Sequence, residues 1–178
     1  MDLNSLKETR QEILAEVEKE FTQELVPAKV TEQEGTDVAV LNVILEDGIV
    51  DGMDATGEFF FLESAKEDEI QFFVNVITIA EDISDEKFAE LGLAISVMNA
   101  YLPVGAFALD ITEKNLIYKH TYEMGTEIDK AAMKDNVDLS MSVAFQTATE
   151  YGYLLIEVLE GDRDPISVIS TFLPEGEE

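Results

Sequence analysis

The spacing of apolar residues at the start of the chain predicts a helix. Apolar side chains recur every three or four positions with charged residues between them, which is the pattern of an amphipathic helix. They are Leu3, Leu6, Ile13, Leu14, Val17, Phe21 and Leu25. Pro27 follows, and proline cannot continue a helix because it lacks a backbone N–H. We therefore expect one helix over residues 2–25.

The next apolar runs have the character of β-strands. Residues 38–45 are rich in Val, Ile and Leu and stop at a turn-forming Glu-Asp-Gly sequence. Residues 58–62 form a short aromatic run, and residues 70–80 are apolar on both alternating faces. A strand with two apolar faces is typical of one that is covered on both sides. We predict a strand in each run and expect 70–80 to be a central or interface strand.

A second helix and a hairpin are predicted beyond Ser84. Serine is a favoured N-cap, the acids after it suit a helix N-terminus, and apolar residues then repeat at helical spacing up to Pro103. Residues 104–111 and 116–124 flank a polar cluster that is typical of a hairpin turn. The second arm places an aromatic face opposite a largely polar one; that face comprises Leu116, Tyr118, His120 and Tyr122.

The last third of the chain predicts a long helix. Apolar residues recur at helical spacing from Ile128 to Leu159 and end near Gly161, with a break expected at 135–139. Residues 165–173 are expected to be extended, and residues 174–178 form a solvated acidic tail. The order is α-β-β-β-α-β-β-α. It predicts an α+β fold in which an antiparallel sheet packs against helices, as a single domain over 1–178 with its core at about 37–161.

The charge of the chain excludes several classes of partner. Among 178 residues, 39 are Asp or Glu and only 11 are Lys or Arg, which gives a formal net charge of -28. Nucleic acids and anionic membranes both require a basic surface, so neither is an expected partner. The acids either cover a solvated surface or attract basic partners and cations. No run approaches the roughly 20 apolar residues of a membrane span, and we expect a cytoplasmic location.

One acidic segment can be compared with a calcium-binding loop. With Asp47 as position 1, Asp51, Gly52 and Glu58 occupy positions 5, 6 and 12 as such a loop requires. Position 3 is Ile49, which has no side-chain oxygen, and the flanking segments are predicted strands instead of helices. Two interpretations stay open. One is a divalent-cation site at Asp47, Asp51, Asp54 and Glu58, and the other is an acidic hairpin loop.

Catalytic chemistry has little support in the sequence. The chain has no cysteine, and its one histidine, His120, cannot build a His-rich metal site. We expect His120 to be a core or strand histidine. Pairs of acids such as Glu67 and Glu69 are too common here to indicate acid–base catalysis. We therefore predict no enzyme activity and no cofactor, and we keep a small carboxylate-based enzyme as a rival hypothesis.

Two sets of apolar residues could meet a partner. The methionines Met98, Met133 and Met141 lie at helical positions, where core packing is the expected use and an adaptable groove the alternative. The strands predicted at 58–62 and 70–80 carry more apolar residues than a sheet with one solvent-exposed face requires. The resulting candidates for partner contacts are Phe59, Phe60, Phe61, Phe72, Val74 and Val76.

Residues 98–119, MNAYLPVGAFALDITEKNLIYK, resemble a segment of the bacterial YbjN family and the type III secretion chaperone-like fold. The shared pattern is a helix that ends at an Asn, a Gly, an alternating strand that ends in Asp, a polar turn, and a strand with Tyr and a base. It is matched by Asn99, Gly105, Phe107, Leu109, Asp110, Leu116, Tyr118 and Lys119. Here Gly105 would permit close backbone approach and Asp110 would start the turn. The resemblance implies frequent dimerisation and partner binding.

Together these observations favour a non-enzymatic module, chaperone-like or regulatory, that binds a peptide or protein segment and forms a homodimer. The hypothesis rests on the element order, the surplus of apolar strand surface and the lack of catalytic motifs. A cation-binding acidic protein that uses the 47–58 loop is the alternative.

Overall fold

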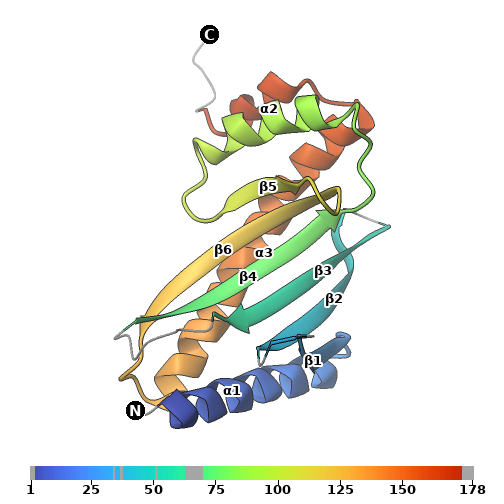
Figure 1. Ribbon diagram of the computed structural model, residues 1–178. Coiled ribbons are helices and arrows are strands. Elements are labelled where there is room, and N and C mark those ends of the chain that lie inside the picture. Colours follow the sequence, from blue (N-terminus) through green and yellow to red (C-terminus); the bar gives the residue numbers. More distant parts are fainter. Residues whose placement is uncertain (1–2, 34, 37, 51, 63–69, 174–178) are drawn as a thin grey trace.

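The chain folds into an α+β structure, as predicted. The computed structural model describes residues 3–33, 35–36, 38–50, 52–62 and 70–173 (Figure 1). Its helices are α1 (Leu3–Gln23), α2 (Phe88–Asn99), α3 (Lys130–Glu160) and the 3₁₀ helix η1 (Pro165–Thr171). Its strands are β1 (Ala28–Glu32), β2 (Ala39–Val50), β3 (Met53–Phe61), β4 (Ile70–Ala80), β5 (Ala106–Asp110) and β6 (Asn115–Gly125). They form one antiparallel sheet in the order β1-β2-β3-β4-β6-β5.

The helices pack on one face and at the two ends of the sheet. Helix α3 passes behind the sheet in Figure 1 and contacts β2, β4 and β6, while α1 lies along the β1 end and contacts β1, β2 and α3. Helix α2 packs against β5, α3 and η1 at the other end. Among the described residues no helix lies on the opposite face of the sheet. We call that opposite face the open face.

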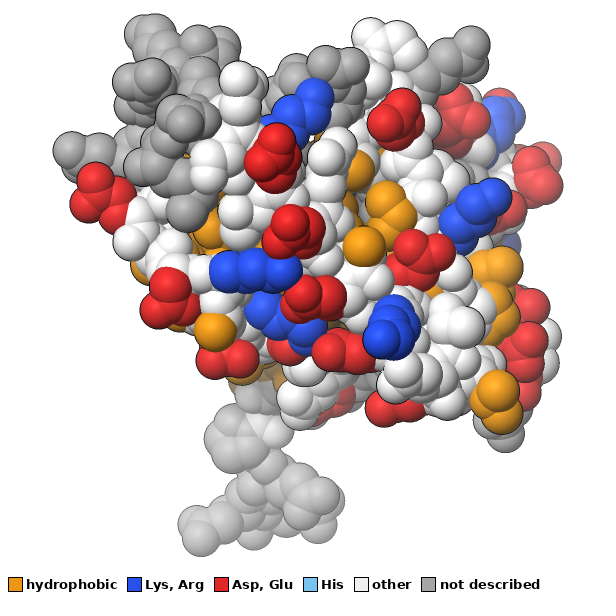
Figure 2. All heavy atoms as spheres, turned by 90° about the horizontal axis from the view of Figure 1, so that it is seen from below, with side chains coloured by type: hydrophobic (Ala, Val, Ile, Leu, Met, Phe, Trp, Pro, Cys, Tyr) orange, Lys and Arg blue, Asp and Glu red, His pale blue; other side chains and the backbone are white. Residues whose placement is uncertain are grey.

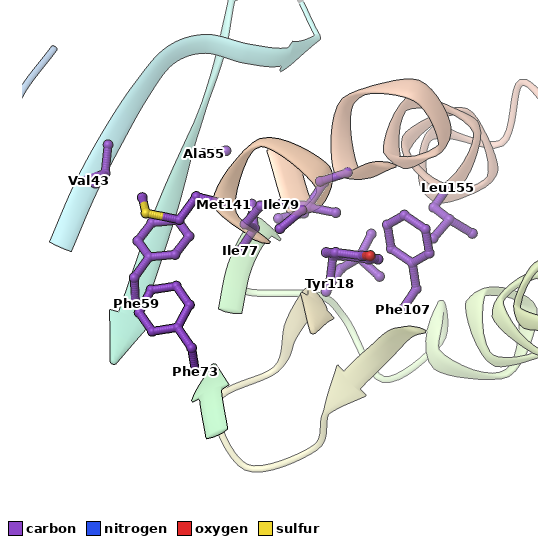
Figure 3. Packing of buried hydrophobic residues seen from close by; sticks show 14 of the residues in the cluster. Val43, Ala55, Phe59, Phe73, Ile77, Ile79, Phe107, Tyr118, Met141 and Leu155 are labelled. Carbon is purple, nitrogen blue, oxygen red and sulfur yellow. The ribbon is translucent and has the colours of Figure 1, made fainter. Parts of the chain in front are cut away.

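The core fills the space between the sheet and its helices. Phe59, Phe73, Ile77 and Tyr118 project from neighbouring strands, and Met141 and Leu155 come from α3 to meet them (Figure 3). The same buried cluster includes Ile13 and Leu14 of α1 and Val168 of η1. The first helix and the last helical turns therefore contribute to the core as well as residues 37–161.

Three sequence predictions about the elements were wrong. Strand β1 was missed, because it is only five residues long and has the weak alternating pattern AKVTE. The break expected at 135–139 is absent, because Val137 is fully buried in the core and its charged neighbours face outward on a continuous α3. The segment after Asp164 is helical instead of extended. The carboxylate of Asp164 caps it by accepting a hydrogen bond from the Ile166 N–H at 2.9 Å.

The start of α2 also differs from its prediction. The helix begins at Phe88 with Lys87 as its N-cap residue, and no side chain caps it. Ser84 instead belongs to the preceding turn, where its carbonyl accepts a hydrogen bond from the Lys87 N–H at 2.9 Å. The predicted boundaries of α1, β4 and the β5–β6 hairpin, by contrast, agree with the structure to within a few residues.

Strand β4 lies inside the sheet, as predicted, but helices cover only one of its faces. Phe73 and Ile77 are fully buried against the helices, whereas Ile70 and Phe72 on the open face are 41% and 40% exposed. Helix cover on both faces is therefore not found in the described part of the chain, and the interface alternative stays a prediction.

The residues that carry the YbjN resemblance form a packed corner. Gly105 has φ of 64°, and a Cβ there would lie 2.2 Å from the Tyr118 hydroxyl. That hydroxyl donates a hydrogen bond to the Val104 carbonyl at 3.1 Å. The Asn99 side chain bonds both the N–H and the C=O of Phe107, each at 2.9 Å. The close approach expected at Gly105 is confirmed, and these residues have structural roles.

Candidate functional site

The acidic loop is a tight hairpin between β2 and β3. Asp47, with φ of 51°, accepts a hydrogen bond from the Gly52 N–H at 2.6 Å, and Asp54 accepts one from the Asp47 N–H at 3.3 Å. Glu58 lies four residues further along β3, paired with Asn42 and Val76, so its backbone is about 13 Å from that of Asp54. Asp51 lies outside the described residues. The hairpin therefore uses Asp47 and Asp54 for its own backbone and does not bring Glu58 to them.

No cluster of three or more potential metal-ligating side chains occurs in the part of the chain that the structure describes. Several carboxylates are held by lysines instead. Lys130 contacts Glu12 and Glu16 at 2.7 Å each, and Lys134 contacts Glu20 at 2.8 Å and Asp138 at 2.7 Å. Acidic and basic side chains accordingly lie side by side on the face of the molecule seen in Figure 2. The pair Glu67 and Glu69 lies outside the described residues.

The open face of the sheet carries an apolar patch. Strand pairing places Val40, Phe60 and Val74 in one row across β2, β3 and β4, with Val76 in the next row and Phe72 beside them on β4. Val74 and Val40 are buried in this row, at 1% and 8% exposed, so the solvent-accessible part of the face is formed by Phe72, which is 40% exposed, and by the partly exposed Phe60 and Val76. We call Val40, Phe60, Phe72, Val74 and Val76 the open-face patch.

The charges around the open-face patch are balanced. Lys29, Glu58 and Lys119 lie in the same row as Val76, and Glu123 lies opposite Phe72. Among the described residues, these two basic and two acidic side chains border the patch, in a chain whose formal net charge is -28. This part of the surface is far less acidic than the composition predicts for an average surface.

The structure separates the predicted partner-contact residues into two groups. Phe60, Phe72, Val74 and Val76 lie on the open face, where Phe72 is exposed and Val74 is buried beneath its neighbours at 1% exposed. Phe59 and Phe61 point the other way and are 0% and 5% exposed. Their assignment as partner contacts was wrong, because successive residues of a strand face opposite sides of the sheet.

A groove that was not predicted from the sequence runs between α1, β2 and α3. It consists of two adjoining hollows of about 240 Å³ and 250 Å³ that share Phe145 as a wall. The Phe145 ring makes edge contacts with Phe21 at 6.3 Å and Phe59 at 5.2 Å between ring centroids. The first hollow is lined by Val17, Glu20, Phe21, Glu24, Asp138, Met141, Ser142 and Phe145. The second is lined by Leu25, Val26, Pro27, Ile44, Leu45, Glu46, Gly48, Phe145 and Thr149.

The methionines pack mainly in the core, as expected. Met98 and Met133 are 0% exposed and Met141 is 3% exposed. Met141 also contributes to the wall of the first hollow.

A polar network lies buried between the sheet and α3. The Asn75 amide donates hydrogen bonds to the Ser140 hydroxyl at 2.8 Å and the His120 carbonyl at 3.3 Å. The Tyr122 hydroxyl donates to the Asn136 side chain at 3.3 Å. These contacts connect β4 and β6 to α3 at defined positions, so they fix how the helix sits on the sheet.

His120 is a half-buried strand histidine within this network. Burial lowers the pKa of His120, and a hydrogen bond with the Ser140 backbone opposes the shift only in part. The unfolded chain therefore binds a proton at a higher pH than the folded chain does. The contribution of His120 to stability is present above its unfolded pKa of about 6.5 and is lost as pH falls through the lower folded pKa.

We expect the free energy of unfolding to fall between pH 7 and pH 5.5, by no more than about 1.4 kcal/mol per pH unit from this single group. Urea unfolding across this range measures the slope. A His120→Phe variant removes the titrating group and should show a shallower slope. An equal slope in both proteins would assign the effect to other residues.

No family model matches the sequence, and no curated protein matches it either. Within the described residues, no helix has the length and apolar character that a membrane span requires.

Proposed function

We propose that this protein is a non-enzymatic protein-binding module, chaperone-like or regulatory, that pairs with a second copy of itself through the open face of its sheet. The observation that carries the proposal is the charge-balanced open face, on which Phe72 is exposed and Phe60 and Val76 are partly exposed beside it.

Electrostatics favours this face over the rest of the surface. Two copies that each carry a formal charge of -28 repel one another, and the repulsion is weakest where charges balance. In a symmetric dimer each copy presents the same patch, so the surface must complement itself. The open face can meet this requirement, because Glu58 and Lys119 lie on the two sides of Val76. In a symmetric dimer, Lys119 of one copy can pair with Glu58 of the second copy, and Glu58 of the first with Lys119 of the second.

Replacing Phe72 with aspartate should dissociate the dimer. A carboxylate at this position would be buried in the interface without a partner, and the dissociation constant should rise by at least roughly tenfold. Phe72 is 40% exposed in the single chain, so folding should tolerate the change. Sedimentation velocity measures the shift from dimer to monomer.

The matched control is Leu139→Asp, which places the same charge at an apolar position that is 54% exposed on α3. It should leave the dimer intact. A native chain that sediments as a monomer at all concentrations, or a Phe72→Asp dimer of native affinity, would rule out self-association through this face.

A further inference from the structure

The groove between α1, β2 and α3 has an apolar floor and an acidic rim. The floor is formed by Val17, Phe21, Met141 and Phe145 in the first hollow and by Val26 and Leu45 in the second. The rim carries four carboxylates, from Glu20, Glu24, Glu46 and Asp138. The apolar floor stabilises a ligand that buries apolar side chains in it, and the carboxylates on both sides attract a basic partner.

The charges of the rim are only partly satisfied within the chain. Glu20 and Asp138 share the single ammonium group of Lys134, at 2.8 and 2.7 Å. Of the residues that the structure describes, no lysine or arginine lines either hollow. The groove therefore retains a net negative charge, in contrast to the balanced open face.

The arrangement of the two hollows indicates the shape of the occupant. Phe145 lines both, so a ligand that fills both must place an apolar group in each hollow next to this ring. Side chains one turn apart on a helix have Cβ atoms about 5–6 Å apart and lie on the same face, so a helix can present two apolar groups to neighbouring hollows. Helix-in-groove recognition uses anchors at such i and i+4 positions.

We propose that the groove binds a basic amphipathic helix of another protein, with apolar residues one turn apart in the two hollows and lysines or arginines against the acidic rim. The first hollow lies between α1 and α3, on the helix-covered side of the sheet and opposite the open-face patch, so it is accessible in the single chain and in the proposed dimer. Binding here does not depend on self-association.

The probe is a fluorescein-labelled synthetic helical peptide of alanine and lysine with leucines four positions apart. Fluorescence anisotropy measures its affinity for the native protein. The complex should weaken as salt increases, because the rim contacts are electrostatic and screened. An otherwise identical peptide with glutamate in place of lysine should not bind. A peptide whose leucines lie two positions apart should bind at least roughly tenfold more weakly, because its apolar groups no longer share a face.

Two substitutions block the hollows without touching the core. Ser142 and Thr149 are exposed on α3 and line the first and second hollow, respectively. Ser142→Arg and Thr149→Arg should each reduce peptide affinity by at least roughly tenfold, by filling a hollow and opposing the lysines. Gln146→Arg is the control, because it adds the same charge at an exposed position of α3 that lines neither hollow.

Three results would overturn the proposal. They are absence of binding by the native protein, equal binding of the glutamate peptide, and native affinity in both Ser142→Arg and Thr149→Arg. Sedimentation of the same variants should show an unchanged dimer, so failure of this proposal is distinguishable from failure of the proposed self-association.

Discussion

A Gly105→Ala variant should lose about 2–5 kcal/mol of unfolding free energy, for two reasons that add at one site. An alanine with φ of 64° is strained by its own Cβ. The new methyl group would also lie 2.2 Å from the Tyr118 hydroxyl and 2.5 Å from the ring carbon that bears it. Tyr118 is fully buried and cannot move aside without losing its packing on Phe107.

Substitutions at two other glycines separate the cost of backbone strain from the cost of the clash with Tyr118. Gly35 also has a positive φ, of 82°, but a Cβ added there would have nothing within 4 Å, so Gly35→Ala should cost only the backbone term of about 1–2 kcal/mol. Gly92 lies within α2 with open space around it. Gly92→Ala should stabilise the protein by about 0.5–1 kcal/mol. Urea unfolding of all three tests the series. Equal losses for Gly105→Ala and Gly35→Ala would show that Tyr118 imposes no steric requirement.

A Phe59→Ala variant should lose about 3–5 kcal/mol, the range for truncation of a buried phenylalanine. Phe59 is fully buried between the sheet and α3 (Figure 3). Its ring contacts the Phe145 ring at 5.2 Å between centroids. Its neighbour Phe60 lies on the open face and is only partly buried. Phe60→Ala should therefore cost distinctly less.

The two variants also separate packing from binding. Phe59→Ala should lower stability and leave the proposed self-association of the folded protein unchanged, whereas Phe60→Ala should weaken that self-association with a smaller effect on stability. Thermal unfolding and sedimentation on the same samples measure both quantities. A larger stability loss from Phe60→Ala would place the core on the other side of β3.

The sequence predicted where most elements lie, but it could not orient two of the strands. A run of three phenylalanines has no alternation, so nothing in residues 59–61 indicates which side each faces. In β4 the pattern was misleading, because Gln71 and Asn75 are 1% and 0% exposed while Phe72 is exposed. Both polar residues are buried because their partners come from elsewhere in the chain. Gln71 accepts a hydrogen bond from Arg10 at 2.9 Å, and Asn75 bonds Ser140.

The candidate sites differ in how far the sequence could predict them. Four members of the open-face patch were predicted as surplus apolar strand residues, because they lie in runs with apolar residues on both faces. The groove was missed because its walls come from residues 17–27, 44–48 and 138–149, which meet only after α3 packs beside α1. Leu25, which was predicted to end the first helix, lies beyond that helix and is 91% exposed at the groove.

The Asn99 side chain protects an edge of the sheet from pairing with a strand of another molecule. Strand β5 is at the edge of the sheet, and alternation along the strand directs the backbone groups of Phe107 and Leu109 outward. Asn99 occupies those of Phe107 through two hydrogen bonds, as an incoming strand would. Unprotected edges are where folded proteins begin to polymerise into fibrils. Asn99 thus disfavours the addition of another strand at the Phe107 position of this edge.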